Sequence, residues 1–125
     1  MNNVIQTKSY AFAIRIVNAY KFLTNDQKEY VLSKQMLRSG TAIGALVAEA
    51  HHAQSSADFL NKMNVALKEA NETFYWLSLL RDTDYLSEQI YKSISIDCKE
   101  LIALLVSIVK SCLLYTSDAA DDSLR

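Results

Sequence analysis

The scarcity of helix-breaking residues is the strongest constraint on the fold of this chain. Its 125 residues include no proline and two glycines, so few positions can interrupt a helix or form a tight turn. Half of the residues are hydrophobic and 22% are charged, a balance that supports one packed core. We therefore predict a single all-α domain.

Apolar residues recur at helical spacing in four segments that are separated by short, polar stretches. The predicted helices cover about residues 8–23, 26–52, 56–82 and 87–112. Thr24 and Asn25 are candidate caps for the second helix, and Ser87 is one for the fourth. Four helices with short connections predict an antiparallel up-down-up-down four-helix bundle.

Both glycines, Gly40 and Gly44, fall inside the second predicted helix. Each costs roughly 1 kcal/mol relative to alanine in a helix interior. The small residues around them predict a compensating close crossing with another helix, and the alternative is a helix break near Gly40.

The bundle domain is expected to span residues 1–112, because the helical pattern stops after Cys112. Residues 113–125 are predicted to form a disordered tail, because the pattern is lost from Leu113 and residues 116–125 are mostly polar and acidic. The residues from Cys112 to Asp122 also resemble a translated sequencing adapter, so we interpret the tail as non-native.

Charge and cysteine content point to the cytoplasm as the location. The formal net charge is −1, which gives no overall attraction to nucleic acid or to an anionic membrane. The most apolar stretch, Leu101 to Val109, is too short to span a bilayer, and residues 1–22 lack a signal-peptide core. Cys98 and Cys112 lie about 21 Å apart along one predicted helix and cannot bridge there. Unpaired cysteines are typical of a reducing compartment.

No catalytic, cofactor or metal site is predicted. Glu49 and His52 have the spacing of a bundle metal-ligand pair, but a ferritin-like site requires a second pair and further glutamates. The first predicted helix has no acidic residue to contribute, so a metal-dependent enzyme is a distant alternative. His51 and His52 are expected to interact with the C-terminal end of their helix.

A structural polar network is predicted between the second and third helices. Glu69 and Glu72 lie one turn apart, and Arg38 and Glu49 share a stripe of the second helix. An arginine between carboxylates fixes helix register more than it adds stability. We therefore assign these residues a structural role: Arg38, Glu49, Glu69 and Glu72.

Basic residues on the first two helices are the candidate nucleic-acid contacts. They are Lys8, Arg15, Lys21, Lys34 and Arg38. One subunit with this patch would bind weakly, whereas a ring of subunits would repeat it and multiply its phosphate contacts. The alternative is an ordinary solvated helix face.

The fourth predicted helix is apolar on nearly every side between Leu101 and Val109. An outer helix of a monomeric bundle needs one apolar stripe, so a second copy of the protein is expected to cover the rest. The predicted oligomer interface consists of Leu101, Leu104, Leu105 and Ile108.

Several motifs resemble one protein family. They are LSKQMLRSGTAIGALVAEA at residues 32–50, ADF at 57–59, ALKEANE at 66–72 and YWL at 75–77. Together they resemble the bacterial four-helix bundle proteins encoded within 23S rRNA intervening sequences, over about residues 6–112. The resemblance implies a homopentamer without known catalytic activity. It also implies a relationship in fold with the accessory proteins of diversity-generating retroelements, which bind reverse transcriptase and nucleic acid.

The sequence thus predicts a non-enzymatic, oligomeric accessory or scaffold protein whose partners are its own copies and RNA or a nucleic-acid-processing protein. The alternative is a protein–protein interaction module that makes no nucleic-acid contact. Salt-sensitive binding would favour the first hypothesis.

Overall fold

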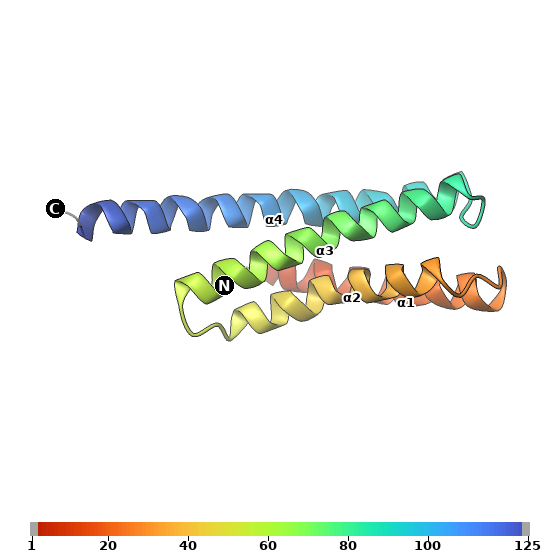
Figure 1. The fold of residues 1–125 in the computed structure, drawn as a ribbon, viewed down its shortest axis with the longest axis horizontal. Coiled ribbons are helices and arrows are strands. Elements are labelled where there is room, and N and C mark those ends of the chain that lie inside the picture. The colour runs from red at the N-terminus through yellow and green to blue at the C-terminus, as the bar shows by residue number, and fades with distance from the viewer. Residues whose placement is uncertain (1–2, 124–125) are drawn as a thin grey trace.

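The computed structural model describes the backbone of residues 3–123 and the side chains of residues 4–114. It consists of helices α1 (Asn3–Asn25), α2 (Leu32–His51), α3 (Ser56–Asp82) and α4 (Glu88–Ser123). Consecutive helices run in opposite directions, and the α1–α2 and α3–α4 turns share one end of the molecule (Figure 1). The predicted all-α four-helix bundle is confirmed.

The core lies along the inward faces of all four helices, with Ile16, Met36, Leu77 and Leu105 fully buried. Consecutive helices pack extensively against one another, whereas α1 and α4 make the fewest contacts. Between α1 and α4 lies a groove of about 220 Å³, whose apolar lining includes Phe22, Ile90 and Ile94. The bundle therefore has three dense helix–helix boundaries and one loose one.

The two glycines lie where α2 crosses α1. A Cβ atom placed on Gly40 would lie 2.8 Å from Cγ1 of Ile16, and one placed on Gly44 would lie 3.2 Å from the backbone oxygen of Ser9. A side chain at position 44 would press on the backbone of α1, and one at position 40 would press on the buried side chain of Ile16. The predicted close crossing is confirmed, and the alternative of a break near Gly40 is wrong, because α2 is continuous.

Helix α2 begins at Leu32, later than predicted, because Glu29 caps it from the turn. The Glu29 carboxylate accepts hydrogen bonds from the backbone amides of Val31, Leu32 and Ser33, at 3.0, 2.9 and 2.6 Å. Thr24, a predicted cap, instead donates its hydroxyl to the backbone oxygen of Tyr20 in α1. A glutamate can occupy a capping position when the turn brings its carboxylate over the free amides.

The Glu29 cap predicts an acid-sensitive stability. Burial by itself would raise the pKa of Glu29, but the backbone hydrogen bonds from Leu32, Ser33 and Val31 outweigh it and lower this pKa. A carboxyl whose pKa is lower in the folded state than in the unfolded state stabilises the protein. This contribution is fully present above the pKa of the unfolded state, about 4.3, and it is lost as the pH falls through the pKa of the folded state. We expect Glu29→Gln to lower the free energy of unfolding at pH 7 by about 1–2 kcal/mol.

Urea unfolding of the wild type and Glu29→Gln at several pH values between 7 and 3 measures this effect. The difference between the two proteins should shrink below about pH 4.3, because glutamine does not titrate. Asp26→Asn is the matched control, since Asp26 is exposed in the same turn. A difference that is constant with pH would contradict the capping role of the charge.

Serine side chains cap the starts of α3 and α4. Helix α3 covers the predicted residues, and the Ser55 hydroxyl accepts from the backbone amide of Asp58 at 3.0 Å. Ser87 accepts from the amide of Ile90 at 3.2 Å, in agreement with its predicted capping role.

The backbone of α4 continues to Ser123, past the predicted helix end at Cys112, where neither proline nor glycine interrupts it. The side chains of residues 115–125 lie outside the described part, and the domain boundary at residue 112 and the non-native tail stay predictions. Within the described residues, no helix combines the length and the apolar character needed to cross a bilayer.

Candidate binding surfaces

Three of the five predicted nucleic-acid contacts form ion pairs within the subunit. Lys8 lies 3.1 Å from Glu100, and Arg15 lies 2.6 Å from Asp97, so both join α1 to α4. The Arg15 guanidinium also donates to the hydroxyl and the backbone oxygen of Ser93. Because neighbouring carboxylates offset these charges, Lys8 and Arg15 are poorly placed to attract phosphate.

Lys21 and Lys34 differ from the other basic residues of the predicted set. Both are exposed, and neither has an ion pair with any side chain in the described range of residues 4–114. They lie on either side of the α1–α2 turn, and their charges are therefore available to an external partner.

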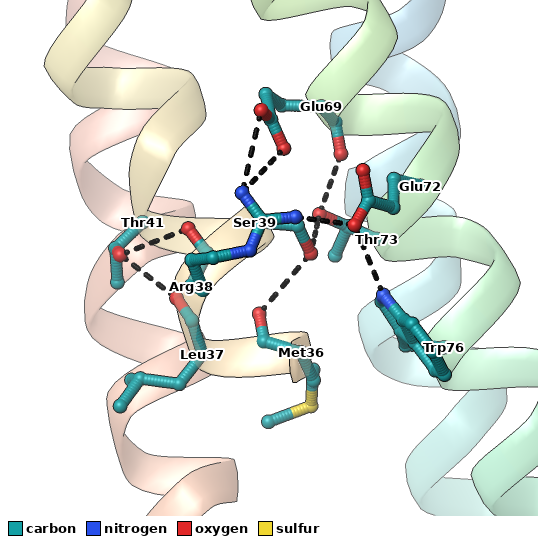
Figure 2. Close-up of polar contacts among 9 residues, drawn as sticks. All are labelled: Met36, Leu37, Arg38, Ser39, Thr41, Glu69, Glu72, Thr73 and Trp76. Atoms are coloured by element: carbon teal, nitrogen blue, oxygen red, sulfur yellow. Dashed lines mark hydrogen bonds and ion pairs between the residues drawn. The ribbon is translucent and has the colours of Figure 1, made fainter. Parts of the chain in front are cut away.

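Arg38 lies at the centre of a polar network between α2 and α3 (Figure 2). Its guanidinium donates to Glu69, with the nearest oxygen at 3.3 Å, and to Glu72. Glu72 also accepts from the indole nitrogen of Trp76 at 3.4 Å. The hydrogen bond to Glu72, with the further contact to Glu69, raises the pKa of Arg38. A single arginine thus binds two successive turns of α3, an arrangement that fixes the register of the two helices.

A second pair of polar groups lies beneath this arginine. The hydroxyls of Thr73 and Ser39 are 2.8 Å apart, and both residues are fully buried (Figure 2). Each hydroxyl can also donate to a backbone oxygen of its own helix, Thr73 to Glu69 and Ser39 to Met36. The bond between the two hydroxyls therefore links α2 to α3 at one register, because it forms only where these two turns face each other.

Glu49, the fourth residue of the predicted network, lies elsewhere. Its carboxylate pairs with Lys62 of α3 at 3.0 Å, close to the α2–α3 connection. The structure therefore brings Arg38, Glu69 and Glu72 together and places Glu49 in a separate ion pair. Lys62 was missed because sequence spacing does not show which residue of a neighbouring helix lies opposite.

The predicted interface residues of α4 divide into two groups. Leu101 and Leu105 are 1% and 0% exposed and belong to the core of their own subunit. Leu104 and Ile108 are partly buried and pack against that core. The α4 surface that a second copy could contact therefore excludes Leu101 and Leu105, while an oligomer interface on this helix stays a prediction.

An exposed apolar surface on α1 was not predicted. Tyr10 is 71% exposed and Ile14 is 50% exposed, and they line a shallow hollow with Ala13 and Val17. We call these four residues the α1 stripe. Apolar residues follow helical spacing on both flanks of this helix, and the structure buries the flank with Phe12, Ile16 and Leu23.

Two comparisons with known proteins bear on the family of this chain. The family model of the 23S rRNA-intervening sequence protein matches residues 1–107. The chain belongs to this family. A crystal structure from the S23 ribosomal protein family of Bacteroides thetaiotaomicron, described as having unknown function, is 61% identical in sequence. It aligns with a TM-score of 0.85 over 86% of this chain and 99% of its own.

The predicted resemblance to the 23S rRNA-intervening sequence proteins is thereby confirmed. No curated protein matches this chain. The family description and the structural neighbour name no reaction, so neither indicates an enzyme family.

Reactive groups are few in this member of the family. Among the described residues, no three histidine, cysteine or acidic side chains are grouped so that they could hold a metal ion. Burial raises the pKa of the Cys98 thiol to about 12, and its sulfur lies 3.4 Å from the backbone oxygen of Ala70. A thiol in this state is protonated at neutral pH and is a poor nucleophile.

Proposed function

We propose that this protein is a non-catalytic, self-associating scaffold. The observation that carries the proposal is the α1 stripe, because two large apolar side chains, Tyr10 and Ile14, are half or more exposed on one helix face. Burying such a surface is favourable by about 25 cal/mol per Å². A second copy of the chain is the partner that is always present at the same concentration.

A role confined to binding is supported by the state of the polar groups. Glu69 and Glu72 are engaged by Arg38, and Glu49 is engaged by Lys62. Catalytic acids and bases require free positions beside a substrate cleft, which these exposed ion pairs do not offer. We also propose a cytoplasmic location, because Cys98 and Cys112 are both free thiols.

Association with RNA is the second part of the proposal, and Lys21 and Lys34 favour it, because neither forms an ion pair with a described side chain. Lys21 also lines the hollow of the α1 stripe, so it lies beside the proposed contact between copies. In an assembly of five copies, the number that the family resemblance implies, these two lysines would occur ten times. Repetition converts weak phosphate contacts into useful affinity. The same repeated lysines would also bind a nucleic-acid-processing protein. The competing proposal is a protein-interaction module that makes no contact with nucleic acid.

The self-association proposal predicts that a charge introduced into the α1 stripe disrupts the oligomer. We expect Ile14→Glu to convert the oligomer into monomers, because a buried unpaired carboxylate costs several kcal/mol at each interface. Light scattering after size exclusion measures the mass. Ile96→Glu is the matched control, since Ile96 is 60% exposed on the outer face of α4.

Two results would overturn this assignment. A monomeric wild type would end the self-association proposal, and loss of assembly in Ile96→Glu alone would place the interface on α4.

Absorbance at 260 and 280 nm, recorded on the same column, tests the proposed association with RNA. Excess 260 nm absorbance that high salt removes supports RNA association, whereas its absence in an intact oligomer supports the protein-interaction module.

A further inference from the structure

Three exposed lysines that form no ion pair with any described side chain surround the α1–α2 turn. They are Lys21 in the last turns of α1, Lys28 in the connection and Lys34 in the first turn of α2. Lys8, Arg15 and Arg38, the other cations of this half of the chain, each contact a carboxylate. The lysines of α1, α2 and their connection that pair with no described carboxylate thus lie at one end of the bundle, which they share with the exposed Asp84 and Glu88 at the α3–α4 turn (Figure 1).

The helix crossing places two of these lysines at the same level. Gly40 packs against Ile16, and the two helices are antiparallel. Lys34 precedes Gly40 by six residues, and Lys21 follows Ile16 by five. With a rise of 1.5 Å per residue, both lie roughly 8 to 9 Å from the crossing toward the turn that contains Lys28.

The acidic residues of the same segment do not cancel these charges. Glu29 is 7% exposed, and its oxygens are occupied by three backbone amides at the start of α2. Its negative charge is therefore directed at the helix terminus, away from an external partner. Asp26 is the one exposed carboxylate between residues 21 and 34, against three lysines.

An exposed aromatic residue also belongs to this segment of the chain. Tyr30 is 57% exposed, and it lies between Lys28 and Lys34 in the chain. It takes part in none of the ring–ring or cation–π contacts found among the described side chains. A free ring beside cations is the arrangement by which proteins stack a base while holding its backbone.

We propose that the turn surface, consisting of Lys21, Lys28, Tyr30 and Lys34, binds single-stranded RNA. The lysines contact phosphates, and Tyr30 stacks on one unpaired base. The inference rests on the RNA association proposed above and names its site. A single strand fits better than a duplex, because a base must be free of its own stack to reach the ring.

Fluorescence anisotropy with a labelled oligouridine of twelve nucleotides tests the site on the full chain. The substitution of Lys21, Lys28 and Lys34 by glutamine should weaken binding at least about tenfold and should reduce the salt slope by about 2. The charge-matched control replaces Lys68, Lys92 and Lys110, which are exposed elsewhere. Equal weakening by both triple variants would overturn the proposal, because only total charge would then matter.

Tyr30→Leu separates RNA from an acidic protein partner. Loss of a base stack should weaken binding by roughly tenfold without changing the salt slope. An unchanged affinity in Tyr30→Leu would overturn the stacking role and leave a surface for any polyanion. Circular dichroism of each variant should match the wild type, because all four side chains are exposed.

Binding of the oligonucleotide by the wild type distinguishes failure of the turn surface as the site from failure of RNA association altogether. If wild type and the turn-surface triple variant bind the oligonucleotide equally well, RNA association stands and this site is overturned. If the wild type forms its oligomer but does not bind the oligonucleotide even at low salt, both the site and RNA association fail.

Discussion

Leu105→Lys is expected to unfold the subunit. Leu105 is 0% exposed in the core between α4 and the other helices, so a lysine there must bury a charge or open the bundle. Loss of the leucine packing alone costs about 2–5 kcal/mol, and the buried ammonium adds several more. This total approaches the whole stability of a small domain, about 5–15 kcal/mol.

Thermal unfolding followed by circular dichroism measures the effect. Leu104→Lys is the matched control, because Leu104 is the preceding residue and is only partly buried at the bundle surface. It should fold with a modestly lower melting temperature. If Leu105→Lys folds normally and changes only the size of the assembly, α4 faces another subunit at this position, and the placement of its inward face is wrong.

Gly40→Ala is expected to destabilise the protein although alanine is the better helix former. The new methyl group would lie 2.8 and 2.9 Å from the two γ carbons of Ile16, too close for ordinary contact. The overpacking penalty, about 1–3 kcal/mol, exceeds the gain of about 1 kcal/mol in helix propensity. Bulkier residues at position 40 should cost more.

A double-mutant cycle with Ile16→Ala isolates this contact. Ile16→Ala alone should cost about 2–5 kcal/mol, and adding Gly40→Ala should then cost nothing further, because the new methyl group enters the vacated space. Ala48→Gly on the exposed face of α2 measures the propensity term alone. Additive effects of Gly40→Ala and Ile16→Ala would show that the crossing is looser than the structure indicates.

The number of helices and most of their limits could be predicted from the sequence, because each helix buries a continuous apolar face. Helix α3 matches its predicted limits, since Ser55 provides a recognisable cap before the apolar pattern. The close crossing was predictable because Gly40 and Gly44 disfavour a helix unless something packs against them. These features depend on one segment at a time.

Features that depend on two segments could not be predicted in the same way. Hydrophobicity shows that α1 and α4 are apolar on several sides, but it does not show which side meets the subunit's own core. For this reason the exposure of Ile14 was missed, and Leu105, which the structure buries in the core, was predicted at the oligomer interface. The Glu29 cap was missed because it depends on the path of the turn, in which Lys28 adopts a positive φ of 58°.

The unequal packing between neighbouring helices also determines how the subunit would respond to mechanical force. The start of α1 lies at the end of the bundle past which α4 projects, so tension between the start of α1 and the end of α4 would peel these two helices apart (Figure 1). They make the fewest contacts of any adjacent pair, and two exposed ion pairs, Lys8 with Glu100 and Arg15 with Asp97, join them. Such pairs contribute about 0–1 kcal/mol each. Rupture would begin at this boundary, while the interlocked α1–α2 crossing would resist until much later.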